Sequence, residues 1–304
     1  MSLNFGRAPG NAEVTIDHDL CSDCGICVEI CKGGPLIMLE GHLAVTHGVM
    51  FDCIACGACV AFCPMDAIRV SGRDLFPEDV LDLPSTTRIT DHDSLQSLLL
   101  RRRSIRDYEE REVESSIVQK VLDSASTAPM GLPPSEVGVL VFSDRKAVVE
   151  AKKALLEQMR KWKWMFSPFS LALMRPFVSR NTFSMYHDFV VPAIKVFDKM
   201  DLQGADWFLY GAPLAFYFYG SAASDPADPL IAADHAMMAA ESLGLGTCML
   251  GFPGYLFQYS NALKKKYGLP GKVQPGIMLI CGYPRYTAQR AIRRRFARVQ
   301  IING

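Results

Sequence analysis

The chain has 304 residues, of which 49% are hydrophobic and 21% charged, and its formal net charge at pH 7 is zero. This length has room for a small module and one medium domain with a sizeable core. We find no window of eighteen uninterrupted apolar residues and no basic stripe with interleaved aromatics, so neither a membrane nor a nucleic acid is an expected partner. The first residues contain no apolar segment typical of an export signal, and we therefore expect a soluble cytoplasmic protein.

The charge is unevenly distributed along the chain. Residues 1–90 contain 5 Lys and Arg against 12 Asp and Glu, so the remainder carries the opposite excess. The acidic N-terminal part and the basic remainder could attract each other, or the acidic part could attract a basic redox partner.

Eight of the ten cysteines lie in two runs near the N-terminus. The run CIACGACVAFCP (Cys53–Pro64) has three thiols at intervals of three, a fourth thiol four residues later, and then a proline. The run CSDCGICVEIC (Cys21–Cys31) has the same form. This spacing is typical of the bacterial iron–sulfur run. Structural zinc is the alternative for four thiols, but zinc sites usually pair two CxxC units from separated strands.

In two-cluster modules of this kind, the fourth Cys of each run ligates the other cluster. The spacing therefore predicts two sets of ligands, which are Cys21, Cys24, Cys27 and Cys63, and Cys53, Cys56, Cys59 and Cys31. Residues 14–70 resemble a bacterial-type ferredoxin with two [4Fe–4S] clusters, although Lys32 stands where that family usually has proline. Each cluster would join the two repeats and so replace the large core that a short domain cannot build.

The remaining elements are read in chain order. Short strands are expected at 14–17 and 67–70, with a hairpin of 36–39 and 42–46 between the cysteine runs. Prolines and scattered acidic residues make 72–90 a linker. Helices are then expected at 95–100, 114–128, 146–161, 168–179, 186–200, 228–243 and 260–267, and strands at 136–142, 214–219 and 273–281. The segment 246–251 reads as a loop. The predicted domains are 1–72, a linker 73–92, and 93–304.

Two cysteines lie outside the runs, and we expect Cys248 and Cys281 to be buried core thiols. Reduced thiolates and clusters indicate a reducing compartment. The aromatic segment 162–210 is read as core or subunit interface that could also set substrate choice.

An organic cofactor is suggested by a cluster of arginines. Neither a GxGxxG after a strand nor a GxxxxGKS is present, so no Rossmann or P-loop site is expected. Guanidinium groups and a hydroxyl at Arg102, Arg103, Ser104 and Arg106 suit a terminal phosphate and a polyol chain. A solvated basic helix end is the alternative interpretation, and charge alone leaves both open.

From about residue 93 the chain resembles the FMN-dependent nitroreductase family. The matching pieces are RRSIRDY (102–108), the segment 125–129, Gly211-Ala-Pro213, SLGLGTC (242–248) and Gly282-Tyr-Pro284. The resemblance implies an α+β fold, an FMN-binding α/β sandwich preceded here by the ferredoxin-like two-cluster domain. It also implies that Arg102, Arg103, Ser104 and Arg106 hold the FMN phosphate and ribityl chain, that Arg293 and Arg295 add phosphate contacts, and that the backbone at Met249, Leu250 and Gly251 lies near the isoalloxazine.

One loop departs from the family pattern. After Ala-Pro the family commonly has Ser-x-x-Asn-x-Gln-Pro-Trp, whose polar groups approach the flavin from the second subunit of a homodimer. Here Pro133 and Ser135 replace the Asn and Gln, and Pro133 has no donor. Flavin contacts in this loop are therefore expected from the main chain, around Met130 and Gly131, or from Ser135.

The combination predicts an electron-transfer flavoenzyme with FMN and two [4Fe–4S] clusters. Electrons would pass from the clusters to FMN and on to a nitroaromatic, quinone or enone. Two alternatives remain, namely an NAD(P)H-linked ferredoxin reductase and a redox sensor or carrier without a dedicated substrate. No catalytic side chain is assigned, because protons can come from water, and Tyr108, His187 and Asp188 are conceivable donors that read better as ordinary core or rim residues.

Overall fold

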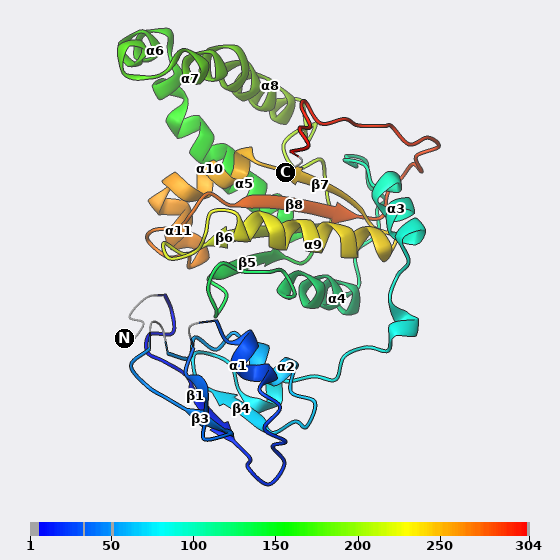
Figure 1. Cartoon of the computed structure of the whole chain (residues 1–304). Helices are drawn as coiled ribbons and strands as arrows, with labels where there is room; N and C mark the ends of the chain where they lie inside the picture. Colours follow the sequence, from blue (N-terminus) through cyan, green and yellow to red (C-terminus); the bar gives the residue numbers. More distant parts are fainter. Residues whose placement is uncertain (1–5, 33, 50–51, 303–304) are drawn as a thin grey trace.

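The computed structural model describes residues 6–32, 34–49 and 52–302. Its elements form a small N-terminal unit and a larger unit built on a four-stranded sheet, joined by a long connector (Figure 1). Within the described residues, no helix is long and apolar enough to cross a membrane.

The N-terminal unit is made of two strand pairs and two short helices. Strands β1 (Glu13–Ile16) and β4 (Ile68–Ser71) pair antiparallel, and β2 (Leu36–Leu39) pairs with β3 (His42–Val45). Its core is small, and the thiols of Cys27 and Cys59 belong to it.

The two cysteine runs have the same local structure. Helix α1 (Ile26–Ile30) follows Gly25, and helix α2 (Ala58–Ala61) follows Gly57. Both glycines are left-handed, with φ of 74° and 72°. Glycine adopts this conformation without the steric cost that a Cβ brings. The turn lets the chain enter each helix directly after a CxxC step.

The connector is mostly exposed and contains two 3₁₀ turns, η1 (Pro77–Asp79) and η2 (Thr86–Arg88). Helix α3 (His92–Arg101) then begins. Its cap is Asp91, which accepts a hydrogen bond from the Ser94 backbone N–H at 2.8 Å. The helix expected at 95–100 therefore begins three residues earlier, at His92.

The larger unit has a sheet of order β5-β6-β8-β7 in which all neighbours are antiparallel. The strands are β5 (Val137–Phe142), β6 (Leu214–Gly220), β7 (Gly246–Leu250) and β8 (Ile277–Gly282). The expected loop at 246–251 is thus mainly an edge strand. Its pairing with β8 supplies the order that this short, glycine-started segment does not encode locally.

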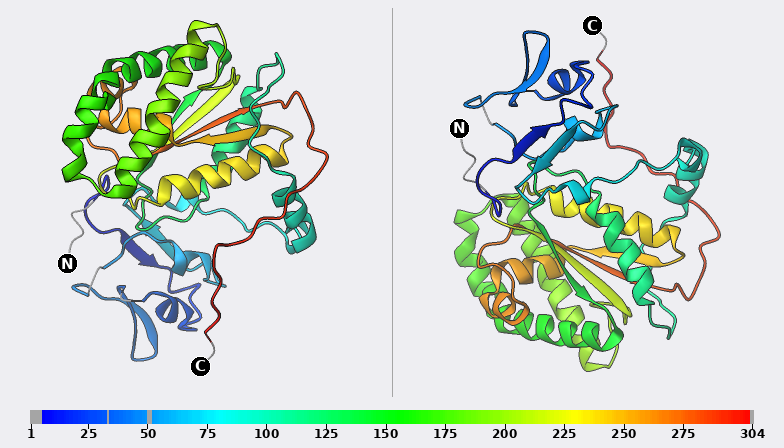
Figure 2. Two further views of the ribbon diagram at one scale, coloured as in Figure 1. Left: turned by 90° about the horizontal axis from the view of Figure 1, so that it is seen from above. Right: turned by 90° about the horizontal axis from the view of Figure 1, so that it is seen from below.

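Helices cover both faces of the sheet (Figures 1 and 2). On one face α4 (Ser115–Ser126) and α9 (Asp228–Ser242) pack against Leu214, Phe216 and Phe218 of β6. On the other face α5 (Arg145–Trp162), α10 (Phe252–Tyr259) and α11 (Asn261–Tyr267) pack against Ala215 and Tyr217. Both sets of β6 side chains are fully buried, which is why this strand reads as a continuous apolar run.

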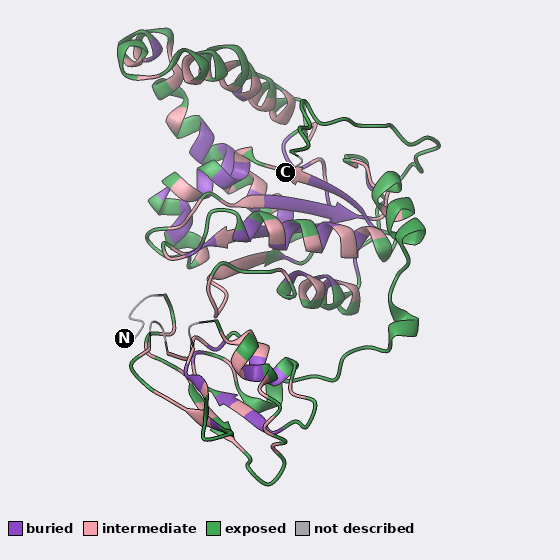
Figure 3. Cartoon of the chain, in the orientation of Figure 1, coloured by how far each residue is buried: buried purple, intermediate pink, exposed green. Residues whose placement is uncertain are grey.

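The aromatic segment forms a helical projection at one end of α5 (Figure 1). Its elements are η3 (Lys163–Phe166), α6 (Pro168–Met174), η4 (Arg175–Phe177), α7 (Arg180–Ser184), the π-helical η5 (Met185–Val190) and α8 (Val191–Leu202). The helix expected to reach residue 179 is therefore a shorter helix with a 3₁₀ turn. Beyond β8, residues 285–302 are exposed and contain no helix or strand (Figure 3).

A close approach of backbones fixes α10 against the sheet. A Cβ on Gly254 would collide with the carbonyl oxygen of Gly276, just before β8. We expect Gly254→Ala to destabilise the protein by about 1–3 kcal/mol through overpacking, measured by chemical denaturation. Gly271→Ala is the matched control, since a Cβ there meets nothing within 4 Å. Equal stability of the two variants would contradict this packing.

Candidate functional site

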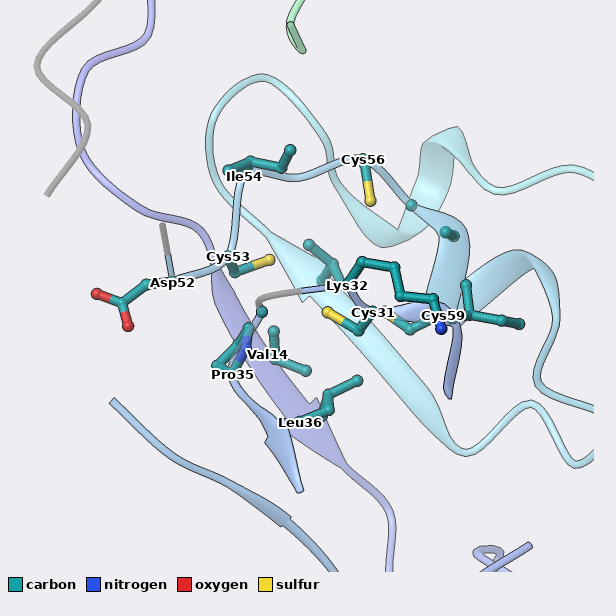
Figure 4. Close-up of a pocket in the computed structure, with 15 residues that line it drawn as sticks. Val14, Cys31, Lys32, Pro35, Leu36, Asp52, Cys53, Ile54, Cys56 and Cys59 are labelled. Atoms are coloured by element: carbon teal, nitrogen blue, oxygen red, sulfur yellow. The ribbon is translucent and has the colours of Figure 1, made fainter. Parts of the chain in front are cut away.

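The eight thiols of the cysteine runs sort into two sets of four around two cavities. A cavity of about 20 Å³ is lined by Cys21, Cys24, Cys27 and Cys63. A cavity of about 90 Å³ is lined by Cys31, Cys53, Cys56 and Cys59. In the larger one, the sulfurs of Cys31, Cys53 and Cys56 point toward one another (Figure 4). Each set takes three thiols from one run and the fourth from the other, which is the distribution that the spacing predicts.

The donor set of each cavity consists of four thiols. Four thiols suit an iron–sulfur cube, and their distribution over two runs with three-residue steps is typical of a cube rather than of zinc.

The thiols of the larger cavity also raise one another's pKa values. Burial, together with the neighbouring Cys53, Cys31 and Cys56, raises the pKa of Cys59 to about 12. Burial likewise raises the pKa of Cys31, with Cys56 adding to it. Four thiolates in this space would repel one another, so a bound cation must supply the compensating charge and displace the protons.

His42 lies beside an acidic side chain of the first cysteine run. Its Nδ1 lies 2.8 Å from the Asp23 carboxylate, which also accepts a hydrogen bond from the Leu43 backbone N–H at 2.7 Å. Asp23 thereby ties the first cysteine run to the β2–β3 hairpin.

The arginine segment after α3 runs beside the edge strand β7. Ser104 forms a parallel bridge with Thr247, and the Ile105 backbone N–H donates to the Thr247 carbonyl at 2.8 Å. Burial raises the pKa of the Cys248 thiol, and Arg106, Ser104 and Arg102 counteract this effect. Three of the four expected cofactor residues are therefore close to one thiol.

Arg103 is the exception among the four. It lines a separate cavity of about 360 Å³ with Gly244–Gly246 and residues 286–291. Its guanidinium donates to the Arg290 carbonyl at 3.4 Å. The segment 102–106 is extended, so alternate side chains face opposite sides. An interpretation of the motif as the end of a helix misses this geometry.

A buried polar atom beside this segment lacks a partner. Within the described part of the chain, the Thr247 hydroxyl is buried without a hydrogen bond. Arg106 lies over the ring of Tyr210, 5.5 Å from its centroid. Unpaired donors and guanidinium groups at one strand edge fit the phosphate and hydroxyl groups of a cofactor such as FMN. Tyr210 was not expected from the sequence, because it is a lone aromatic without a motif.

The loop before β5 lies at the opposite corner of the sheet. Met130 and Ser135 line a cavity of about 530 Å³ that also contains Asp228. The Gly131 backbone N–H donates to the Asp228 carboxylate at 3.4 Å. Strands β5 and β7 are the two edges of the sheet, and three strand spacings separate them by about 14 Å. One chain therefore does not bring this loop to Arg102, Ser104 and Arg106.

The other expected cofactor residues lie in two further places. Leu250 and Gly251 line an apolar cavity of about 790 Å³ between α5, α10 and the aromatic segment. Arg293 and Arg295 are exposed in the C-terminal segment. Within the described residues, these two arginines make no hydrogen bond or ion pair, so this chain alone does not add them to the site.

The two units contact each other through the same loop before β5. The Arg7 guanidinium donates to the Ser135 carbonyl at 2.9 Å and pairs with Asp74, and the Arg7 backbone N–H donates to the Glu136 carboxylate. Arg73 donates to the Pro133 carbonyl at 2.7 Å. The sequence did not single out these arginines, since isolated basic residues carry no motif.

Two cysteine cages joined to a layered α+β unit with a basic strand edge define an oxidoreductase of the iron–sulfur type. Residues 99–283 match the nitroreductase family model, and this chain belongs to the nitroreductase family. Residues 20–68 match the 4Fe–4S dicluster domain. The expected fusion of a ferredoxin-like part with a nitroreductase fold is thus confirmed.

Individual relatives agree with each part. An uncharacterized ferredoxin of Methanocaldococcus jannaschii is 30% identical over 59 residues, 19% of this chain and 77% of the relative. A nitroreductase of Bacteroides fragilis, crystallised with bound FMN, has the same fold at a TM-score of 0.51 and 15% identity, covering 70% of this chain and all of that one. An FMN-dependent nitroreductase of Clostridium difficile has a TM-score of 0.47 and 17% identity, covering 69% of this chain and all of that one.

The raised thiol pKa values predict a pH dependence of iron uptake. Thiols with a raised pKa are protonated at neutral pH, and each must lose its proton to bind iron. We expect anaerobic reconstitution with ferrous iron and sulfide to become more complete as the pH rises from about 6 to about 9. Iron per chain is the measurement. Uptake that is independent of pH, or that falls as the pH rises, would contradict the assignment.

Proposed function

We propose that this protein is an iron–sulfur flavoprotein that passes electrons from two [4Fe–4S] clusters to FMN and on to an electrophilic acceptor of the nitroaromatic, quinone or enone type. The observation that carries the proposal is the sorting of eight thiols into two sets of four, in one chain with a nitroreductase domain. The proposed division is a cluster domain of 1–72, a linker of 73–92 and a flavin domain of 93–304. The proposed setting is the cytoplasm, whose reducing poise keeps thiols available.

The cluster ligands in this proposal follow the two cavities. One cluster takes Cys21, Cys24, Cys27 and Cys63, and the other takes Cys31, Cys53, Cys56 and Cys59. Each cluster joins the two runs, so it adds cross-links to a unit whose hydrophobic core is small.

The FMN site in this proposal is centred on the β7 edge. Arg102, Ser104 and Arg106 hold the phosphate and ribityl chain, and Leu250 and Gly251 border the ring system. The bound FMN of the Bacteroides fragilis neighbour supports this choice of cofactor. When bound, FMN supplies redox chemistry that accepts electrons singly and delivers them in pairs. Arg103 binds the FMN from the neighbouring cavity if residues 286–291 move together with it.

A homodimer completes this site. Met130, Gly131 and Ser135 lie at the opposite corner of the sheet from Ser104, so only a second copy can bring them to the same flavin. The exposed segment 285–302 carries Arg293 and Arg295 together with apolar side chains such as Phe296, which is 86% exposed. These features support an arm that packs on the partner subunit.

The acceptor binds in the apolar cavity beside Leu250. Its walls include Trp162, Phe197, Phe208 and Phe252, which suit a flat, weakly polar molecule. Tyr108 is a poor proton donor, because burial raises its pKa and its hydroxyl already donates to the Ile105 carbonyl at 2.8 Å. Protons therefore come from water or from the substrate side of the cavity.

The ligand sets predict the iron content of paired variants. The wild-type chain should bind about eight iron. Cys21→Ser with Cys63→Ser removes two ligands of one cluster, so about four iron should remain. Cys59→Ser with Cys63→Ser removes one ligand from each cluster, so both clusters should be weakened and iron should fall well below four. If each run held its own cluster, the two double variants would exchange these results.

The proposed flavin site predicts a variant that loses flavin but keeps its iron. Arg106→Met should lower the flavin content of the purified protein at least about tenfold, since a charged hydrogen bond to phosphate is worth roughly 1.5–3 kcal/mol. Iron content should stay the same. Arg88→Met, in the exposed connector, is the control for loss of a positive charge. A wild-type chain that binds no flavin would refute the proposed function itself.

The electron donor separates the proposal from its alternatives. Anaerobic turnover of a nitroaromatic or quinone with a low-potential one-electron donor, such as reduced ferredoxin, is the expected result. Rapid flavin reduction by NADH or NADPH would instead favour an NAD(P)H-linked ferredoxin reductase. No turnover with either donor would favour a redox sensor or carrier.

A further inference from the structure

Arg73 is a buried charged residue at the boundary of the two units. Its side chain is 6% exposed and donates only to backbone carbonyls. One nitrogen reaches Ala8 at 2.6 Å and Gly10 at 2.9 Å, another reaches Pro133 at 2.7 Å, and Nε reaches Ile54 at 3.4 Å. Ile54 directly follows Cys53, so one guanidinium spans from the larger thiol cavity to the loop before β5.

The turn that carries Arg73 has an uncommon backbone. Gly72 and Leu75 exchange two backbone hydrogen bonds, and the residues between them, Arg73 and Asp74, have φ of 50° and 63°. Such a hairpin turn is usually made by Asn and Gly, because left-handed backbone disfavours residues with larger side chains. Arg73 occupies this position against its preference, which indicates that its side chain has a role at that place.

The neighbouring residue strengthens the same contact. Asp74 pairs with Arg7, which donates to the Ser135 carbonyl and to the Glu136 carboxylate. Glu136 in turn accepts a hydrogen bond from Ser221, at the end of β6. The turn therefore holds the loop 133–136 through two arginines and fixes it to the sheet.

The charge of Arg73 has no carboxylate partner. Among the described residues it forms no ion pair, although a buried charge is normally paired. Its Nε donates to the carbonyl of Ile54, which lines the larger cavity next to Cys53. A cluster with four thiolates carries net negative charge, and in this cavity it would provide the missing counter-charge.

We propose that Arg73 couples the cluster held by Cys31, Cys53, Cys56 and Cys59 to the loop 129–136, so that this cluster is the inner one, which delivers electrons to the flavin. The other cluster is then the outer one and receives electrons from a small one-electron donor. Leu20 and Ile26, in or beside the first cysteine run, and Met65, which lines the same cavity, are 46%, 39% and 46% exposed. The inference rests on the proposed function, because it requires bound clusters and FMN.

The electron balance is simple. Each transfer oxidises the inner cluster by one electron, and the outer cluster restores it. Two such transfers, with two protons from water, reduce FMN to its dihydro form. The electrons come from a low-potential one-electron donor, which is oxidised.

The first experiment replaces Arg73 without disturbing its turn. Arg73→Asn removes the guanidinium and keeps a residue that tolerates left-handed backbone, whereas Arg73→Lys keeps the charge but not the fork of donors. Arg69→Asn on β4 is the matched control, since it loses a charge of the same unit that pairs only within that unit, with Asp66. In chains loaded with clusters and flavin, amide hydrogen exchange of residues 131–136 should quicken in both Arg73 variants and not in the control.

The same loaded variants are then tested for electron transfer. After anaerobic mixing with photoreduced deazaflavin, flavin reduction through the clusters should slow by about ten- to a hundredfold in Arg73→Asn, because small misplacements of redox groups have large effects. Arg73→Lys should slow less, and Arg69→Asn should match the wild type. A wild-type rate in Arg73→Asn, at wild-type iron and flavin content, would overturn the proposal.

The second experiment asks which cluster delivers the electrons. Cys24→Ser and Cys56→Ser change matching thiols of the two runs, and both thiols are exposed. Flavin reduction by the remaining cluster should be at least about tenfold slower in Cys56→Ser, which loses the inner cluster, than in Cys24→Ser. The reverse order would overturn the proposal. A wild-type chain without flavin or iron would instead refute the proposed function, so the two failures are distinguishable.

Discussion

The structure of the N-terminal unit depends on the repulsion between thiolates. Two groups of four thiols face inward, and burial together with mutual repulsion raises the pKa of a member such as Cys59. A core of eight principal buried residues, two of them cysteines, cannot offset this cost by itself. A metal cluster reverses the sign of the interaction, since the same buried sulfurs then become ligands. Cluster binding and folding of this unit are therefore coupled.

The larger unit obeys a different constraint, which is the geometry of its sheet. The basic segment pairs with β7 at one edge, and the loop 129–136 precedes β5 at the other edge. A molecule held by Ser104 is out of reach of Ser135 of the same chain. Because the loop 133–136 is also the contact with the N-terminal unit, each chain would deliver electrons to a flavin whose phosphate is bound by its partner. Dimerisation and electron transfer would then depend on the same loop.

The sequence predicted those features whose physical cause is local. The spacing of the cysteines reflects tight turns at Gly25 and Gly57, and the continuous apolar run of β6 reflects burial on both faces. Ser104 and its arginines could be named from a motif, but their division between two cavities follows from the pairing of Ser104 with Thr247, over a hundred residues away. The strand β7 was missed for the same reason, since only β8 orders it.

Arg73 shows where reasoning from sequence stops. The left-handed turn at Gly72-Arg73-Asp74-Leu75 could not be predicted from Arg73, because Arg is not a residue that such a turn prefers. Its four carbonyl acceptors come from segments far apart in the chain, including Ala8 and Pro133. A residue kept in an unfavourable conformation, buried, and without a counter-ion among the described side chains requires a compensating interaction. In our proposal, the negative charge of a reduced cluster beside Cys53 would provide it, and Arg73 would then favour the reduced state of that cluster over that of its neighbour.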